Sequence, residues 1–392
     1  MKKLISTAIA LAMLLSLAAC GSDEGGSTAE ADVTTMAATE AVKDETTATA
    51  EETTVSEETT AEETTTTEPP LEIVEPAAED FEYNYDAAVK GVIITQYIGK
   101  DKAIRIPAEL DGDPVVQFVL NNNVITHVEI PDGFTSIGYR AFSKCPNLKS
   151  VTIPDSVTEI CEEAFNKCPK LESITISNNV TRIWGNAFNE CTSLKSVVIP
   201  DSVKEFGYWA YESNSGCGSS VFTGCENLET VTLPERMEQE WFGGFIGCKN
   251  LKEITIPDGV KKISGLRGCE SLESITIPDG VEIIGDYAFS NCKGLKEVTI
   301  PASVKLIDGH AFEYCEGLKK VTLPDGVILG NFTFGYCTGL RNITLPDDVK
   351  KNWDYIFEGS EGLTVTYKGS EYNYTNFRDM EKLIPYDLSY ET

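Results

Sequence analysis

Histidine is scarce in this 392-residue chain, which contains only two, His127 and His310. The chain also lacks the motifs HExxH, GxSxG and the Walker-type loop, which set metal ligands, a nucleophile or a phosphate-binding backbone at fixed spacing. We expect His127 on the outer face of a sheet and His310 on a different face, so the two do not form one site. The sequence therefore predicts no enzyme activity, no metal site and no cofactor.

Positive charge is scarce as well, with 32 Lys and Arg against 62 Asp and Glu and a net charge of −30. An acidic chain repels nucleic acids and anionic membrane surfaces, so neither is expected as a partner. Beyond the first twenty residues no apolar run is long enough to span a membrane. We therefore expect membrane contact only through the N-terminus.

The N-terminus has the organisation of a processing signal. Lys2 and Lys3 precede an apolar run over residues 4–19, which ends in the sequence LAACG at residues 17–21. This ending resembles the lipobox of bacterial lipoproteins. The resemblance implies cleavage before Cys20, lipid attachment to its sulfur, and an extracytoplasmic, surface-exposed protein anchored on the cell membrane by more than one acyl chain. The alternative is an ordinary secretory signal in which the cysteine is accidental.

Residues 20–80 form a separate compositional regime, rich in Thr, Glu, Ala and Ser. Between residues 21 and 80 there are 18 acidic residues and one lysine, Lys43. Such a segment has too little apolar surface to offset the entropy lost on ordering. We interpret it as a disordered tether.

A line of about 23 residues is then repeated along the chain, with the pattern L-x-x-[VI]-x-[IL]-P, a turn, V-x-x-I and A-F-x-x-C. The cysteines that close the repeats are Cys145, Cys168, Cys191, Cys225, Cys248, Cys269, Cys292, Cys315 and Cys337, at spacings of 23, 23, 34, 23, 21, 23, 23 and 22 residues. A fixed period of this length indicates stacked coils rather than a globule with one central cleft.

Each repeat predicts one coil. In residues 148–170, Leu148, Val151 and Ile153 alternate as a short strand, which Pro154 ends because proline lacks an N–H for the sheet. Stacking places like residues about 4.8 Å apart. The phenylalanines therefore form a ladder, comprising Phe142, Phe165, Phe188, Phe222, Phe245, Phe289, Phe312, Phe334 and Phe357. We interpret the cysteines as a parallel ladder of buried free thiols; disulfides between neighbouring coils are the alternative.

Over roughly residues 87–367 the pattern resembles the BspA-like, or Treponema-type, leucine-rich repeat family. The resemblance implies a right-handed solenoid of β-rich coils with a parallel sheet on one face. It also implies a bacterial surface protein linked to adhesion or to binding host molecules. Three departures stand out: Ser177 replaces the proline of its repeat, the coil ending at Cys269 is short and lacks the Ala-Phe pair, and 11 extra residues fall around residues 212–220.

We expect caps to cover the ends of the stack. The expected divisions are a lipoprotein signal peptide (1–19), the tether (20–80), an N-terminal cap with the first coils (81–124), the solenoid (125–362) and a C-terminal cap (363–392). Within the caps we expect strands at 91–97 and 103–106, a hairpin at 364–374 and a helix from about 376 to 384.

The residue after the repeat leucine alternates in charge along most of the stack: Lys149, Glu172, Lys195, Glu229, Lys252, Glu273, Lys296, Lys319 and Arg341. Opposite charges on neighbouring strands attract, so this row is expected to hold the coils in register. The last three residues break the alternation and form a basic patch, which could seat an anionic glycan. A row of threonines on the same face is either ordinary strand surface or a hydroxyl array for a repetitive ligand such as ice or a polysaccharide.

Aromatic residues gather around the 34-residue spacing: Trp184, Tyr208, Trp209, Tyr211, Trp241 and Phe242. Clustered exposed aromatics commonly anchor recognition surfaces. We hypothesise that Trp209 and Trp241 flank a ligand-binding patch beside the inserted loop. The alternative is that these side chains pack beneath that loop as a satellite core.

Two further features have mainly structural interpretations. Cys161 and Cys217 lie off the ladder and are expected to be surface thiols, since neither has a histidine within reach for a nucleophilic dyad. Aspartates at the turns stack in an acidic row, which the Asp-Gly turn explains; calcium binding is the alternative. The members of this row are Asp132, Asp155, Asp201, Asp258, Asp279 and Asp325.

Together these features predict a lipid-anchored bacterial cell-surface protein that binds other macromolecules at the cell exterior, such as a protein or glycan of a host or neighbouring cell. A structural envelope protein and the solute-binding lipoprotein of a transporter remain the alternatives. The second requires two lobes that close on a small molecule, which a continuous solenoid lacks.

Overall fold

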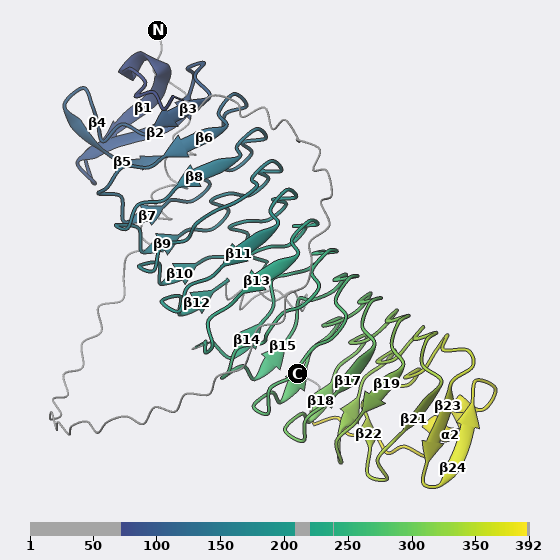
Figure 1. Ribbon diagram of the computed structural model, residues 1–392. Helices are drawn as coiled ribbons and strands as arrows, with labels where there is room; N and C mark the ends of the chain where they lie inside the picture. Colours follow the sequence, from purple (N-terminus) through teal and green to yellow (C-terminus); the bar gives the residue numbers. More distant parts are fainter. Residues whose placement is uncertain (1–71, 208–219, 238, 390–392) are drawn as a thin grey trace, which may run out of the picture. The chain divides into compact units, whose positions relative to one another are not determined.

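The computed structural model describes residues 72–207, 220–237 and 239–389. The expected signal peptide and most of the expected tether lie outside this range. The described residues form a β-solenoid of about eleven coils with parallel sheets (Figure 1). The predicted fold class is confirmed.

Most repeats begin with a three-residue strand, and these strands run parallel along what we call the first sheet face. They are β3 (Ala103–Arg105), β6 (His127–Glu129), β8 (Ser150–Thr152), β11 (Ser196–Val198), β13 (Thr230–Thr232), β17 (Glu297–Thr299), β19 (Lys320–Thr322) and β21 (Asn342–Thr344). The repeats that begin at Leu171, Leu251 and Leu272 lack such a strand, although single bridges at Glu253 and Ser274 continue the pairing in the last two. Equivalent positions pair, as Ser196 does with Thr230 and Glu297 with Lys320. The sequence period thus sets the register of this face.

A second row of strands, which we call the second sheet face, was not predicted. Its two-residue strands come from the V-x-x-I segment: β7 (Ser136–Ile137), β9 (Glu159–Ile160), β10 (Arg182–Ile183), β12 (Glu205–Phe206), β14 (Trp241–Phe242), β15 (Lys262–Ile263), β16 (Ile283–Ile284), β18 (Leu306–Ile307), β20 (Ile328–Leu329) and β22 (Lys350–Lys351). They form two parallel sheets, interrupted between β12 and β14. The interruption coincides with the 34-residue spacing.

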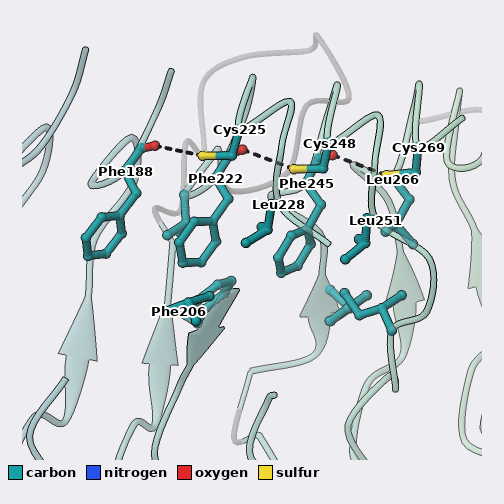
Figure 2. Packing of buried hydrophobic residues seen from close by; sticks show 14 of the residues in the cluster. Phe188, Phe206, Phe222, Cys225, Leu228, Phe245, Cys248, Leu251, Leu266 and Cys269 are labelled. Carbon is teal, nitrogen blue, oxygen red and sulfur yellow. Dashed lines mark hydrogen bonds between the residues drawn. The ribbon is translucent and has the colours of Figure 1, made fainter. Parts of the chain in front are cut away.

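The core between these faces contains the predicted ladders (Figure 2). All nine ladder phenylalanines are fully buried, and stacked neighbours have ring centroids 5.0–5.9 Å apart. In the short coil, Leu266 takes the place of the missing phenylalanine and is equally buried. The nine ladder cysteines are buried thiols without disulfides, as predicted.

The thiol ladder is more than a column of small apolar groups. From Cys168 onward each Sγ donates a hydrogen bond to a carbonyl oxygen of the preceding coil, as Cys225 does to Phe188 at 3.1 Å and Cys248 to Phe222 at 3.2 Å (Figure 2). At the next position Ser360 donates the same bond to Phe334 at 2.8 Å. The ladder is therefore a chain of polar links between coils.

Every regular coil also bends through left-handed backbone positions around its Ala-Phe pair. Arg140 and Lys144 have φ values of 58° and 61°, and Tyr287 and Asn291 have 53° and 61°. Residues other than glycine rarely adopt such angles. Their side chains leave the backbone in a fixed direction, so equivalent side chains stack along the outside of the solenoid.

The N-terminal cap is a four-stranded sheet in the order β1-β2-β5-β4. Its elements are a 3-10 helix η1 (Ala78–Asp80) and the strands β1 (Phe81–Asp86), β2 (Gly91–Tyr97), β4 (Glu109–Leu110) and β5 (Asp113–Phe118). The strand predicted at 91–97 is confirmed as β2, and the strand predicted at 103–106 forms as β3. β1 and β5 were not predicted, because they lie outside the repeat.

The C-terminal cap contains the predicted hairpin, β23 (Thr364–Tyr367) and β24 (Ser370–Asn373), and a helix α2 (Phe377–Glu381) that is shorter than expected. After the helix, Tyr386 pairs with Lys351 of β22. Lys351 N–H donates to the Pro385 carbonyl at 3.0 Å, and Asp387 N–H donates to the Lys351 carbonyl at 2.8 Å. The C-terminal segment thus covers the end of the second sheet face.

Candidate functional site

Ion pairs on the surface join successive coils. The alternating row behaves as predicted, with Lys149–Glu172 at 3.9 Å, Glu229–Lys252 at 2.7 Å and Glu273–Lys296 at 2.5 Å. Two further rows alternate in the same way and were not predicted. They contain Glu226–Lys249 (2.7 Å) and Glu270–Lys293 (3.3 Å), and Lys261–Glu282–Lys305 (3.4 Å each). These charges hold neighbouring coils in register.

The predicted basic patch is smaller than the sequence suggested. Lys296 is engaged by Glu273, and Arg341 donates to the Glu361 carbonyl at 3.4 Å. Lys319 is exposed, and no ion pair joins it to another described residue. Lys296 is neutralised by Glu273, so the patch contains two cations that have no carboxylate partner among the described residues, Lys319 and Arg341, instead of the three that were predicted.

The interruption of the second sheet face is bridged by one side chain. Gln239 Oε1 accepts a hydrogen bond from the Phe206 N–H at 2.9 Å, and its Nε2 donates to the Trp241 carbonyl at 3.0 Å. The side-chain amide thus replaces the peptide group of a missing strand between β12 and β14. Trp241 consequently stands at the first position of a new sheet.

Of the two described tryptophans near the interruption, Trp184 and Trp241, the second is the more exposed, at 40%. Lys262, in the next strand, places its Nζ 4.3 Å from the indole centroid. Burial lowers the pKa of this ammonium. A cation over one face of the indole fixes the ring in place, so the exposed part of Trp241 is a rigid aromatic surface.

Phe242 does not belong to this surface. Its side chain is 1% exposed and packs 6.0 Å from the Phe245 ring. Successive side chains of a strand point to opposite faces, and because β14 was not predicted, this alternation was missed. The prediction that Phe242 is part of an exposed patch is therefore wrong.

Trp184 is half-buried and is positioned by a carboxylate. Its indole N–H donates to Glu159 Oε1 at 2.7 Å, and Glu159 is itself only 7% exposed. Arg182 lies between Glu159 and Glu205, at 4.0 and 3.2 Å. Tyr208, Trp209 and Tyr211 lie outside the described residues, so the patch can be described only at Trp184 and Trp241.

A second set of aromatic side chains was missed by sequence reasoning. Tyr287, His310, Phe332 and Tyr355 occupy equivalent left-handed positions in four successive coils, and their rings stack at 4.4, 5.1 and 5.7 Å. Arg267 lies over one end at 4.8 Å and Arg378 over the other at 3.4 Å. Aligning the repeats on the residue two before each ladder phenylalanine would have revealed this aromatic column.

The described cysteine and histidine side chains that were candidates for catalysis or metal binding are engaged in packing and in contacts within the fold. Cys161 is 4% exposed, so the expectation that it is a surface thiol is wrong. Cys217 lies outside the described residues. His310 is within the aromatic column, with Nδ1 3.0 Å from Glu313. Among residues 72–207, 220–237 and 239–389, no three His, Cys, Asp or Glu side chains gather as metal ligands.

The fold and these surfaces define a leucine-rich repeat protein with extended exposed faces. The BspA type leucine rich repeat region matches the chain in six copies, over residues 115–216, 210–266 and 264–378. Since these matches cover most of the chain, the protein belongs to the BspA type leucine-rich repeat family. Comparison with curated proteins gave no match.

Comparison with solved structures found several bacterial proteins that are similar to this chain. A leucine-rich repeat protein from Bacteroides ovatus is 26% identical with a TM-score of 0.53, over 73% of this chain and 86% of its own. A leucine rich cell surface protein from Faecalibacterium prausnitzii is 24% identical over 79% of this chain and 96% of its own, with a TM-score of 0.42. The pneumococcal vaccine antigen PcpA is 18% identical over 76% and 88%, with a TM-score of 0.48.

Membership has general consequences. BspA-type proteins are typically found at the cell surface, and leucine-rich repeat proteins generally bind other macromolecules without catalysing reactions. Within the part of the chain that the structure describes, no helix has the length and apolar character of a membrane span.

Proposed function

We propose that this protein is a lipid-anchored bacterial surface protein that binds a protein or glycan at the cell exterior. The observation that carries the binding role is Trp241, a rigid and 40% exposed indole at the point where the second sheet face is interrupted. Rigid aromatic side chains are frequent anchors of recognition surfaces. Trp184 is proposed as a further member of this surface, as is Trp209, which lies outside the described residues.

We propose that the ligand binds at the Trp241 surface rather than at the first sheet face. There the charged rows are largely paired between coils, which leaves few groups to recognise a partner. The solute-binding alternative receives no support from a single continuous repeat stack. The Lys319 and Arg341 patch contributes only two cations.

The binding role is tested with the purified protein on an array of glycans and extracellular-matrix proteins. We expect at least one ligand, and we expect Trp241→Ala to weaken its binding by about tenfold or more, because hot-spot aromatics contribute roughly 2 kcal/mol or more. Tyr85→Ala, which removes an exposed aromatic residue of the N-terminal cap, is the matched control and should bind normally. A folded Trp241→Ala variant that keeps full affinity for every ligand contradicts the placement.

The anchor is proposed from the lipobox-like residues 17–21. We expect the wild-type protein to partition with membranes and to incorporate labelled fatty acid. Cys20→Ser should abolish the labelling and release the chain from the membrane fraction, because no other residue is proposed to carry lipid. Membrane association that survives Cys20→Ser without labelling would show a different attachment.

A further inference from the structure

The C-terminal cap contains a cavity separate from the Trp241 surface. It lies between the last coil and α2, has a volume of about 180 Å³, and is lined by Phe357, Glu358, Tyr374, Phe377, Arg378 and Glu381. Pockets for drug-sized ligands typically enclose roughly 300–1,000 Å³. The cavity is therefore sized for a single small ring rather than for an extended ligand.

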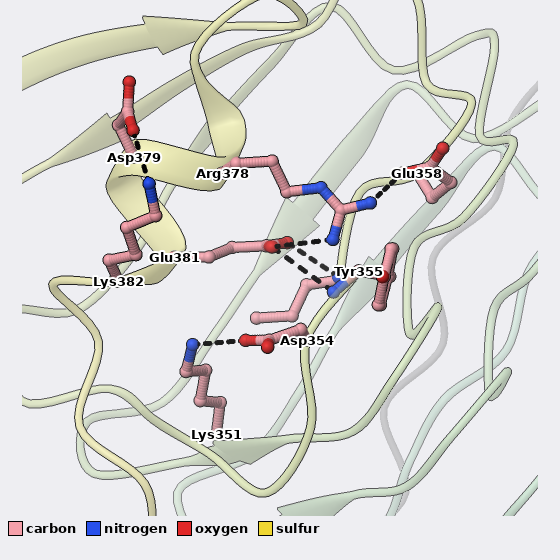
Figure 3. A network of polar contacts seen from close by, with 9 residues as sticks. Lys351, Asp354, Tyr355, Glu358, Arg378, Asp379, Glu381 and Lys382 are labelled. Carbon is pink, nitrogen blue, oxygen red and sulfur yellow. Dashed lines mark hydrogen bonds and ion pairs between the residues drawn. The ribbon is translucent and has the colours of Figure 1, made fainter.

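The polar side of the cavity is an exposed pair of side chains. Arg378 Nη2 donates to Glu358 Oε2 at 2.8 Å, and the two side chains are 46% and 35% exposed (Figure 3). A guanidinium has five N–H donors and a carboxylate has two acceptor oxygens. Their mutual bond uses one of each, so the pair still offers a donor beside an acceptor. This arrangement matches two neighbouring hydroxyl groups, each of which donates and accepts.

A buried carboxylate holds this pair in place. Glu381 is 3% exposed, and its oxygens accept hydrogen bonds from the N–H groups of Ile356 at 2.9 Å and Tyr355 at 3.3 Å (Figure 3). It also lies 3.8 Å from Arg378 Nη1. The cation is fixed from below by the Tyr355 ring at 3.4 Å. The polar groups are thus preorganised, which reduces the entropic cost of binding.

The charges of the cavity favour a neutral ligand. Its single cation, Arg378, lies between the carboxylates of Glu358 and Glu381, so no positive charge remains for an anion. A cationic ligand would have to compete with Arg378 for both carboxylates. An uncharged molecule rich in hydroxyl groups needs no free positive charge and does not compete with Arg378 for the carboxylates.

The apolar side of the cavity consists of aromatic rings at different inclinations. Tyr374 is 45% exposed and meets the Phe377 ring edge-to-face at 81°, while Phe377 is tilted by 52° against Phe357. The faces of such rings carry partial negative charge and attract the positively polarised C–H groups of a sugar ring. We propose that this cavity binds one residue of a neutral glycan, through Tyr374 and the Arg378–Glu358 pair. The inference rests on the proposed role in macromolecule binding but uses a site of its own.

The test uses the full chain and neutral monosaccharides as probes, namely the methyl glycosides of glucose, galactose, mannose and N-acetylglucosamine. Saturation-transfer NMR and titration should reveal at least one that binds in the millimolar range. Tyr374→Leu should weaken that binding by about tenfold, which corresponds to roughly 1.4 kcal/mol. Glu358→Gln should weaken it as well, because it disturbs the donor–acceptor pair without removing the aromatic wall.

The matched control is Trp353→Leu, which removes another exposed aromatic side chain of this end, 60% exposed, that does not line the cavity. Its sugar binding should equal that of the wild type, and thermal melting should show that all variants are folded. Sugar binding unchanged in both Tyr374→Leu and Glu358→Gln would overturn the inference, as would preferential binding of methylamine or acetate. A chain that captures macromolecules through Trp241 but binds none of the four glycosides overturns this inference and leaves the proposed function intact.

Discussion

The ladder cysteines connect neighbouring coils by hydrogen bonds, and their buried thiols have low reactivity. From Cys168 onward each Sγ lies in the core and donates to a carbonyl of the neighbouring coil, and burial raises the pKa of Cys225 to about 12. A thiol with so high a pKa has almost no thiolate at neutral pH, and thiolate is the reactive form. We therefore expect the ladder to resist oxidation, although the spacing of stacked strands is compatible with disulfides between neighbouring coils.

The hydrogen bond, rather than sulfur itself, should decide which residues the ladder tolerates. Cys225→Ser should lose about 1 kcal/mol of unfolding free energy or less, since Ser360 already makes the same bond in the last coil. Cys225→Val keeps the apolar character but removes the donor and adds bulk, so it should lose roughly 1–3 kcal/mol. Urea unfolding measures both values. The reverse order would mean that the ladder is purely apolar.

The strands and the hairpin differ in how far the sequence alone predicts them. The strand at 91–97 and the hairpin at 364–374 were predictable because alternation and turn residues mark them locally. The second sheet face was not, since a two-residue strand has too little sequence to alternate. That omission led directly to the error at Phe242, whose direction relative to Trp241 depends on β14 being a strand.

The C-terminal segment is held on β22 by carboxylates that should release it in acid. The ion pair with Lys351 lowers the pKa of Asp354, and hydrogen bonds from Ser389 and Lys350 lower the pKa of Asp387. A carboxylate with a lowered folded pKa stabilises the fold above its unfolded value, about 3.9, and this stabilisation is lost as the pH falls through the folded pKa. We therefore expect residues 384–389 to lose hydrogen-exchange protection below about pH 4.

A matched pair of variants isolates this effect. Asp387→Asn should loosen the same segment already at neutral pH and flatten its pH dependence. Asp379→Asn breaks an exposed pair with Lys382 within α2 and should leave the segment protected. Protection of residues 384–389 that stays constant from neutral pH down to about pH 3 would contradict the assignment.

At the scale of the whole molecule, the three charged rows favour some pairs of neighbouring coils over others. We call this pattern of charges the register code. Between Glu226 and Lys305 each row alternates in sign from coil to coil, so a coil there matches the coil after it but repels a coil of its own type. Solenoid stability is roughly a sum over coils and their interfaces. Charge should therefore determine which coils can become neighbours.

Deleting coils tests this code. Removing residues 270–292, one coil, places Lys249 beside Lys293, Lys252 beside Lys296 and Lys261 beside Lys305. Removing residues 249–292, two coils, restores opposite neighbours such as Glu226 with Lys293 and Glu229 with Lys296. We expect the one-coil deletion to have the lower urea midpoint at low salt and to recover with added salt, which screens exposed charges. Equal midpoints with equal salt dependence would rule the code out.

The sequence by itself determined the period, the buried ladders and the pairing of the alternating charges. It could do so because residues one period apart become neighbours whenever coils stack in register. The repeat pattern therefore predicts each of these contacts. The tertiary structure alone decided the second sheet face, the Gln239 bridge, the aromatic column and the cavity under α2. The second sheet face and the aromatic column recur with the period, but they depend on left-handed backbone angles and on two-residue strands that are too short to show alternation in the sequence. The Gln239 bridge and the cavity under α2 occur once each, because they depend on the interruption of the second sheet face and on how the terminal segment folds back on the last coil.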